Sequence, residues 1–98
     1  MTKYRAVRTF CAGRWFDSKA EVNRYLELLV MGEAGLVTNL ELQPWWSIHG
    51  VAKYRADFAY DFNGERIIED VKGVRTAVYA LKKKLVEAEH GIVILEVR

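Results

Sequence analysis

Cysteine and proline are nearly absent: the 98-residue sequence holds one of each. The single Cys11 excludes an intrachain disulfide, and no spacing of cysteine and histidine resembles a zinc site, which is typical of proteins in a reducing compartment. No apolar run reaches the roughly 18 residues of a membrane span, and the first residues, which include Lys3 and Arg5, lack the apolar core of a signal peptide. We therefore expect a cytoplasmic protein with no membrane partner.

The composition is that of a folded domain rather than a disordered or repetitive chain, because 51% of the residues are hydrophobic and 29% are charged. A chain of this length buries only about 60 to 70% of its unfolded surface, so a partner subunit or a bound ion would add stability. We expect one domain over residues 1–98, with residues 1–14 as a basic N-terminal arm.

Charge of one sign is missing from the N-terminal region, where Lys3, Arg5, Arg8 and Arg14 precede the first acid, Asp17. A second basic cluster lies at residues 82–84, although the net charge of +2 is too small to indicate nucleic-acid binding by itself. Each cluster has two interpretations, a contact with phosphates or a solvated arm or helix face. Taken alone, each cluster favours the second.

The hydrophobic pattern predicts an α/β fold in the order helix, strand, strand, strand, helix, strand, with a mixed sheet flanked by helices. The pattern between Trp45 and Gly50 is ambiguous between a loop and the end of a strand. The predicted elements are a helix over 19–31 with a capping box at Ser18, strands over 36–42, 54–62 and 65–72, a helix from near Thr76 that stops at Gly91, and a strand over 92–97.

Asn63-Gly64 predicts a tight hairpin turn, and this turn sets the register of the two strands around it. If these are the two loop residues, Tyr60 lies opposite Ile67 and Asp57 lies opposite Asp70. Alternation then sorts the side chains onto two faces. One face receives Tyr54, Ala56, Phe58, Tyr60, Ile67, Glu69 and Val71, and the other receives Arg55, Asp57, Ala59, Ile68, Asp70 and Lys72.

Two directly opposed aspartates repel one another unless a cation neutralises them. Carboxylate oxygens suit Mg²⁺, which typically takes one or two carboxylates together with waters and a substrate phosphate. Lys72 shares the face of Asp70, so its ammonium adds positive charge where a phosphodiester would develop negative charge. The other interpretation is an ordinary polar sheet face, and from spacing alone the two are about equal.

Four segments in order resemble the PD-(D/E)XK nuclease superfamily, and within it a phage-borne family whose relatives include Holliday junction resolvases. Ala56-Asp57 followed by Asp70-Val71-Lys72 carries the nuclease motif, with alanine in place of its proline. The resemblance spans Phe16 to Val97 and implies a restriction-endonuclease-like core. The segments are Phe16-Asp17-Ser18-Lys19-Ala20-Glu21, Leu40-Glu41-Leu42-Gln43-Pro44, Tyr54-Arg55-Ala56-Asp57-Phe58 and Glu69-Asp70-Val71-Lys72-Gly73.

The resemblance implies that Asp57 and Asp70 bind Mg²⁺, for which Mn²⁺ substitutes, and that the Val71 carbonyl completes the metal shell. Lys72 would position the water or stabilise the developing charge. Glu21 would hold a second metal or a metal-bound water, which requires its helix to pack over the acidic face. The capping box explains Glu21 equally well without catalysis.

The basic residues around this motif are candidate DNA contacts, through side chains or through a helix N-terminus. Trp45, Trp46 and Tyr54 are candidates for stacking on unpaired bases, although core or interface positions are the commoner role of such residues. The candidate DNA-binding residues are Arg5, Arg8, Arg14, Arg55, Arg75, Thr76, Tyr79, Lys82 and Lys83.

The expected function is therefore a metal-dependent DNA endonuclease, acting on a Holliday junction or other branched DNA in phage recombination or replication, in the cytoplasm of a bacterial host. Two symmetric cuts need two sites, so a homodimer is expected. A general nuclease without selectivity for branches fits the same residues. The alternatives from other classes are a non-catalytic DNA-binding module and a structural protein whose tryptophans form an interface.

Overall fold

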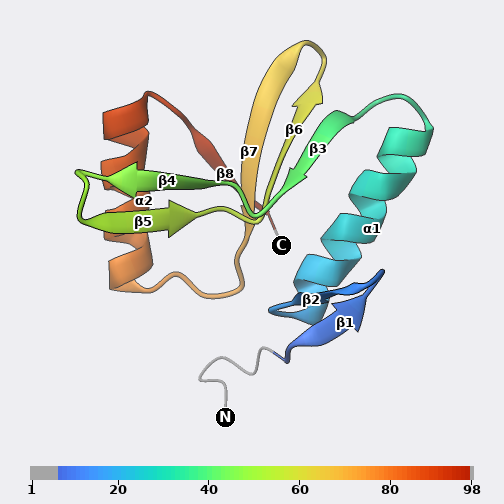
Figure 1. Ribbon diagram of the computed structural model, residues 1–98, viewed down its shortest axis with the longest axis horizontal. Coiled ribbons are helices and arrows are strands. Elements are labelled where there is room, and N and C mark those ends of the chain that lie inside the picture. Colours follow the sequence, from blue (N-terminus) through green and yellow to red (C-terminus); the bar gives the residue numbers. More distant parts are fainter. Residues whose placement is uncertain (1–6, 98) are drawn as a thin grey trace. The chain divides into compact units, whose positions relative to one another are not determined.

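The computed structural model describes residues 7–97, and the chain forms two compact units that divide between Val37 and Thr38 (Figure 1). Arg5, a predicted DNA contact, lies outside the described residues. Each unit has its own elements, which are given separately below. The prediction of one nuclease-like domain over the whole chain stays a prediction.

The first unit begins with a hairpin of strands β1 (Thr9–Cys11) and β2 (Arg14–Phe16). The predicted extended piece at Trp15 and Phe16 is confirmed as β2, but the prediction of an arm up to residue 14 is wrong from Thr9 onward. Both turn residues, Ala12 and Gly13, have positive φ, at 51° and 82°. Such turns are usually marked by Asn-Gly or Asp-Gly, so Ala-Gly gave no clear hairpin signal.

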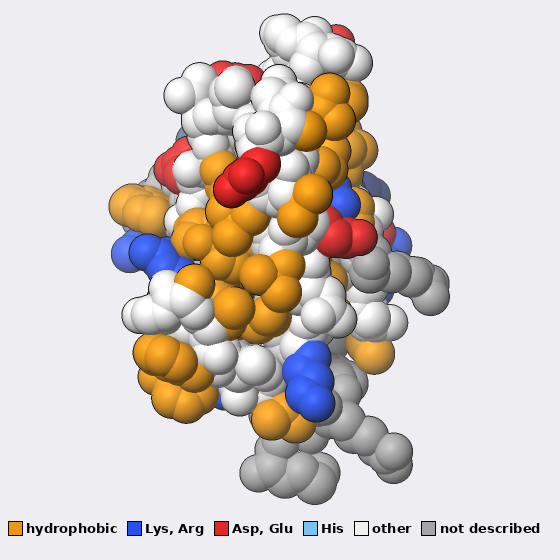
Figure 2. Space-filling view, turned by 90° about the vertical axis from the view of Figure 1, so that its right-hand side faces the viewer, with side chains coloured by type: hydrophobic (Ala, Val, Ile, Leu, Met, Phe, Trp, Pro, Cys, Tyr) orange, Lys and Arg blue, Asp and Glu red, His pale blue; other side chains and the backbone are white. Residues whose placement is uncertain are grey.

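Helix α1 (Lys19–Glu33) follows, and its N-terminus is capped as predicted, because the backbone N–H of Glu21 donates to Oγ of Ser18 at 3.2 Å. The helix ends two residues later than predicted. It buries Val22 and Leu28. Leu26, Leu29 and Val30 are exposed on the same helix. Figure 2 is viewed from the side of α1 and shows hydrophobic side chains gathered over this helix.

The second unit contains a four-stranded sheet in the order β3-β6-β7-β8 (Figure 1). The first two pairings are antiparallel and β7–β8 is parallel, so the predicted mixed sheet is confirmed. The α/β class with two helices is also confirmed, while the restriction-endonuclease-like identity of this core stays a prediction. The strands are β3 (Thr38–Leu42), β6 (Phe58–Phe62), β7 (Glu65–Val71) and β8 (Ile94–Val97).

The predicted hairpin register is confirmed, because Tyr60 pairs with Ile67 and Phe62 pairs with Glu65. Asn63 and Gly64 both have positive φ, at 52° and 78°, as a two-residue turn of this type requires.

A second two-stranded sheet consists of β4 (Trp45–Ile48) and β5 (Ala52–Arg55). The prediction of one continuous strand over 54–62 is therefore wrong, and the ambiguous segment after Pro44 is a strand. The chain turns at Gln43, whose φ is 55°, and the facing strand breaks at the same level, where the N–H of Ala56 donates to the Pro44 carbonyl at 2.9 Å.

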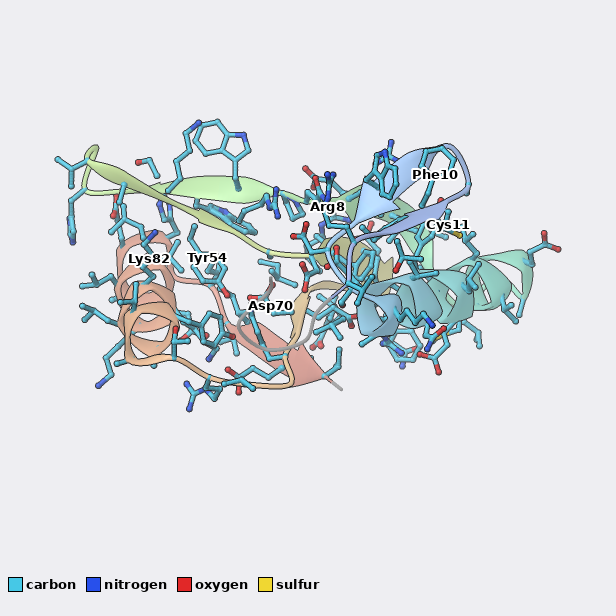
Figure 3. All side chains as sticks on the ribbon, turned by 90° about the horizontal axis from the view of Figure 1, so that it is seen from below. Arg8, Phe10, Cys11, Tyr54, Asp70 and Lys82 are labelled. Atoms are coloured by element: carbon cyan, nitrogen blue, oxygen red, sulfur yellow. The ribbon has the colours of Figure 1, made fainter. Side chains whose placement is uncertain are left out.

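Helix α2 (Ala77–His90) connects β7 to β8 and packs against β4 and β5 (Figure 3). Thr76 caps its N-terminus and Gly91, with φ of 65°, ends it, close to the predicted limits. Neither helix is long and apolar enough to cross a membrane within the described part of the chain. The core of this unit contains Ile48, Tyr54, Ala56, Ala59, Ile68, Val86 and Ile94.

Candidate active site

Asp57 and Asp70 lie together at the end of the β6–β7 hairpin that is remote from its turn. The N–H of Asp57 donates to Oδ1 of Asp70 at 3.0 Å, and the N–H of Val71 donates to Oδ2 of Asp57 at 2.8 Å. This arrangement follows from the register, because Phe58 pairs with Glu69 and the preceding position therefore faces Asp70. The predicted juxtaposition of the two acids is confirmed.

Both carboxyl groups are buried, with exposed fractions of 8% for Asp57 and 1% for Asp70. The pKa of Asp57 is raised to about 6, mainly by burial and also by the charge of Asp70, against the opposing effects of the Val71 N–H and Lys72. Burial also raises the pKa of Asp70. Removal from water disfavours the charged form of a carboxyl group, and a bound cation would favour that form again.

Tyr54 is the closest aromatic partner of the pair, since its hydroxyl donates a hydrogen bond to Oδ2 of Asp70 (Figure 3). Tyr54 packs in one core cluster with Ala59 and Ile68, so the prediction that placed it on the face opposite these residues and Asp70 is wrong. The break between β5 and β6 resets the alternation of side chains, so Tyr54 turns toward the acids. Burial and the bond to Asp70 raise the pKa of the Tyr54 hydroxyl.

Lys72 lies beside the acids, as predicted from its position two residues beyond Asp70. Its charge lowers the pKa of both Asp57 and Asp70. The ammonium Nζ lies 4.6 Å from the centre of the Tyr79 ring, which holds the charge by a cation–π contact. The N–H of Lys72 donates to the Val97 carbonyl at 2.9 Å, so strand β8 fixes its backbone.

Glu96 is a site residue that the sequence analysis missed. It is the register partner of Asp70 on the parallel strand β8, and its charge raises the pKa of Asp70. Tyr79 donates to Glu96 Oε2 at 2.8 Å and Arg75 forms an ion pair with the same oxygen at 2.9 Å. The Tyr79 hydrogen bond is the main reason why the pKa of Glu96 is lowered. Only the parallel pairing of β7 with β8 identifies this acid.

Glu69 and Glu21 are the two other acids near the motif in sequence. Glu69 is fully buried and accepts a hydrogen bond from the Tyr60 hydroxyl at 2.5 Å, so it lies on the face opposite Asp70, as alternation predicts. Glu21 is buried in helix α1, which belongs to the other unit. The prediction that Glu21 lies over the acidic pair therefore stays a prediction.

The structure gives several of the predicted DNA contacts a role within the protein. The Thr76 hydroxyl accepts the N–H of Tyr79 at 3.1 Å as a helix cap. Lys83 forms an ion pair with Glu87 at 3.1 Å, and the Lys82 ammonium lies 3.5 Å from the Lys53 carbonyl. Neither lysine contact prevents a second bond to phosphate, because an ammonium has three donors, and the Thr76 hydroxyl keeps its own O–H donor.

The remaining basic candidates that the structure describes are Arg14 and Arg55, which lie on two hairpins, and Arg8, which directly precedes β1. Arg14 is exposed on β2, and Arg8, in the first unit, has its guanidinium 5.1 Å from the centre of the Trp15 ring. Arg55 is exposed on β5, and its charge lowers the pKa of Asp57. Of the predicted DNA contacts on the β4–β5 hairpin, Arg55 is therefore the one whose charge acts on the acidic pair.

The donor set of the pair fits Mg²⁺, which is commonly held by one or two carboxylates with waters filling the other positions. Three carboxylate oxygens already accept protein hydrogen bonds, from the N–H groups of Asp57 and Val71 and from the Tyr54 hydroxyl. Each oxygen keeps a second lone pair for a cation. Within residues 7–97, no group of three or more His, Cys, Asp or Glu side chains forms a ready metal cage.

The second unit is thus a small α/β structure with a mixed sheet, whose hairpin holds two buried aspartates beside a lysine. The chain belongs to the family described as "Protein of unknown function (DUF1064)", whose family model matches residues 1–97. No curated protein and no solved structure matches the chain.

Proposed function

We propose that this protein is a Mg²⁺-dependent endodeoxyribonuclease that hydrolyses phosphodiester bonds in branched DNA. The observation that carries the proposal is the burial of Asp57 against Asp70 with the charge of Lys72 beside both. Two buried carboxylates of raised pKa destabilise a protein unless they serve a ligand, and perturbed acids of this kind concentrate at functional sites.

In this proposal Asp57 and Asp70 hold Mg²⁺ or Mn²⁺, with the Val71 carbonyl as a further ligand. The bound ion supplies Lewis-acid activation of the phosphoryl group and lowers the pKa of an attacking water. Lys72 then stabilises the charge that develops on the phosphoryl oxygens. The Tyr79 ring keeps its ammonium in place, since the two lie 4.6 Å apart.

The proposal extends to the surroundings of the site. Arg75, Thr76, Tyr79, Lys82 and Lys83 lie at the start and in the first two turns of α2, where phosphates of the bound strand would lie. Glu21 serves a second metal or a metal-bound water. A homodimer provides the two sites that symmetric resolution of a junction needs, and the enzyme acts in the cytoplasm of a bacterial host.

A non-catalytic DNA-binding module is the second candidate. The specific observation in its favour is that residues 7–97 gather no third metal-ligating side chain around Asp57 and Asp70. Such a module would bind DNA through the same basic residues and would leave cleavage to a partner.

The test compares wild-type protein with Asp70→Asn on labelled four-way junction, Y-fork and linear duplex, each with Mg²⁺, with Mn²⁺ and with chelator. Glu65→Gln is the control, because Glu65 is exposed at the hairpin turn. The proposal expects metal-dependent cuts in the branched substrates that fall at least about 100-fold in Asp70→Asn and persist in the control. Cleavage of all three substrates alike would mean a general nuclease, and binding without cleavage under every metal would favour the binding module.

A further inference from the structure

The β4–β5 hairpin has one face in the core and one face outward. Trp46 and Ile48 on β4 pack into the core with Tyr54 on β5, and Ala52 packs against them. Because side chains alternate along a strand, the residues between them point the other way. Trp45 is accordingly 57% exposed.

The outward face of this hairpin is basic and aromatic. Trp45 pairs directly with Arg55, and the ammonium of Lys53 lies 4.5 Å from the centre of the Trp45 ring. Both basic residues are exposed. The segment from Pro44 to Ala56 contains no aspartate or glutamate. A tryptophan with two cations and no acid in its own hairpin has the charge that complements a nucleic-acid strand.

The base of the β4–β5 hairpin is connected to the backbone of Asp57 by hydrogen bonds. The N–H of Gln43 donates to the Asp57 carbonyl at 2.9 Å, and the N–H of Ala56 donates to the Pro44 carbonyl at 2.9 Å. Trp45 is two residues beyond Gln43, which is roughly 7 Å of extended chain. Trp45 and Tyr54 lie on opposite faces of the hairpin, and the Tyr54 hydroxyl bonds to Asp70, so the Trp45 ring faces away from the acidic pair. A DNA strand reaches both only by crossing the edge of the hairpin.

We propose that Trp45, flanked by Lys53 and Arg55, is a stacking platform for an unpaired base of the bound DNA, on the face of the hairpin opposite the acidic pair. This inference rests on the proposed function and narrows its substrate to DNA with unpaired nucleotides, such as flaps, forks or single strands. Bases inside a duplex have both faces covered by their neighbours, so an exposed indole ring gains a partner only from an unpaired base. Each stacked base contributes about 1–3 kcal/mol to binding, which corresponds to roughly a 5- to 150-fold change in affinity.

The two other aromatic candidates do not compete for this role. Trp46 and Tyr54 are packed in the core, and the Tyr54 hydroxyl is bound to Asp70. Tertiary structure thus separates the exposed Trp45 ring from the partly buried Trp46 and the buried Tyr54, which the sequence presents together.

The test measures binding of fluorescent oligo(dT) and of a fully paired duplex in chelator, where no cleavage occurs. The variants are Trp45→Ala, Trp45→Phe and the control Val51→Ala, which removes an 88% exposed apolar side chain from the same hairpin. We expect Trp45→Ala to weaken oligo(dT) binding at least about fivefold, with a smaller loss in Trp45→Phe and none in the control. Duplex binding should change less than twofold, and thermal unfolding should be unchanged.

Tryptophan fluorescence gives a second measurement that does not depend on affinity. Oligo(dT) should quench wild-type emission, and the quenching should be lost in Trp45→Phe. An unchanged oligo(dT) affinity in Trp45→Ala would overturn the inference while leaving the nuclease proposal intact. Conversely, Trp45-dependent binding without cleavage in any metal would sustain the inference and contradict the nuclease proposal.

Discussion

The backbone N–H of Asp57 donates a hydrogen bond to the carboxylate of Asp70, and Asp57 in turn accepts from the N–H of Val71. The two acids are thus held in register by main-chain groups rather than by flexible side chains. This arrangement keeps the carboxylates close in the absence of a cation. Burial is the main reason why the pKa values of both acids are raised, and these raised values have consequences that can be measured.

The stability of the metal-free protein should depend on pH through Asp57. Its pKa is about 6 in the folded state and 3.8 as the reference value, so the folded state binds more protons between these values. The contribution of Asp57 to the stability of the folded state is therefore fully present below about pH 4 and is lost as the pH rises through about 6. The loss is on the order of 1–3 kcal/mol. Urea denaturation of wild type and Asp57→Asn in chelator, from pH 4 to 7, should show a steeper slope in the wild type, since the variant keeps only the contribution of Asp70.

Metal binding should show the opposite dependence on pH, because the carboxylates must lose their protons to bind a cation. Mn²⁺ affinity should fall by up to about tenfold per pH unit below pH 6. Calorimetric titration at pH 5 and pH 7 measures this change. An affinity that does not vary between these pH values would place the cation elsewhere.

Replacing Tyr54 by phenylalanine removes the hydroxyl that donates to Asp70 and leaves the ring in the core. The cost should be about 1–3 kcal/mol, because a buried carboxylate loses a donor. Tyr79→Phe is the matched control, since its hydroxyl bonds to Glu96, whose side chain is 31% exposed and retains Arg75. Urea denaturation should rank Tyr54→Phe as the less stable variant, and equal stabilities would show that the bond to Asp70 contributes nothing.

Lys72→Met should lower the rate of cleavage at least about 100-fold while DNA affinity changes only a few-fold. The reason is that its charge acts where negative charge develops in the transition state rather than where DNA is first held. Lys84→Met, on the exposed surface of α2, provides the comparison. Single-turnover cleavage and binding in chelator separate the two effects, and a loss confined to binding would assign Lys72 to DNA contact.

Thr76→Ala should destabilise the second unit by about 1 kcal/mol, because the hydroxyl caps helix α2. Ser18→Ala removes the corresponding cap of α1 and should cost a similar amount. If Thr76 only caps the helix, DNA affinity in its folded variant will equal that of the wild type. A several-fold loss of affinity at full folding would assign the hydroxyl to phosphate binding as well.

Local signals in the sequence were sufficient for the helices and for the central hairpin. Ser18 and Thr76 begin helices and Gly91 ends one, because caps satisfy backbone groups within a few residues. Asn63-Gly64 set the register that places Asp57 beside Asp70. A prediction fails where the signal is weak or distant, as at the Ala12-Gly13 turn.

The Asn63-Gly64 turn is enough to predict the acidic pair, since a two-residue turn fixes which positions face one another along a hairpin. Which other side chains surround that pair depends on how distant strands pack together. The break between β5 and β6 turns Tyr54 toward Asp70, and the parallel pairing of β8 brings in Glu96. Both contacts join strands that are far apart in the sequence, and no local sequence pattern predicts such partners. The same packing partly buries Trp46 against the core and leaves Trp45 exposed, although the two are neighbours in the chain.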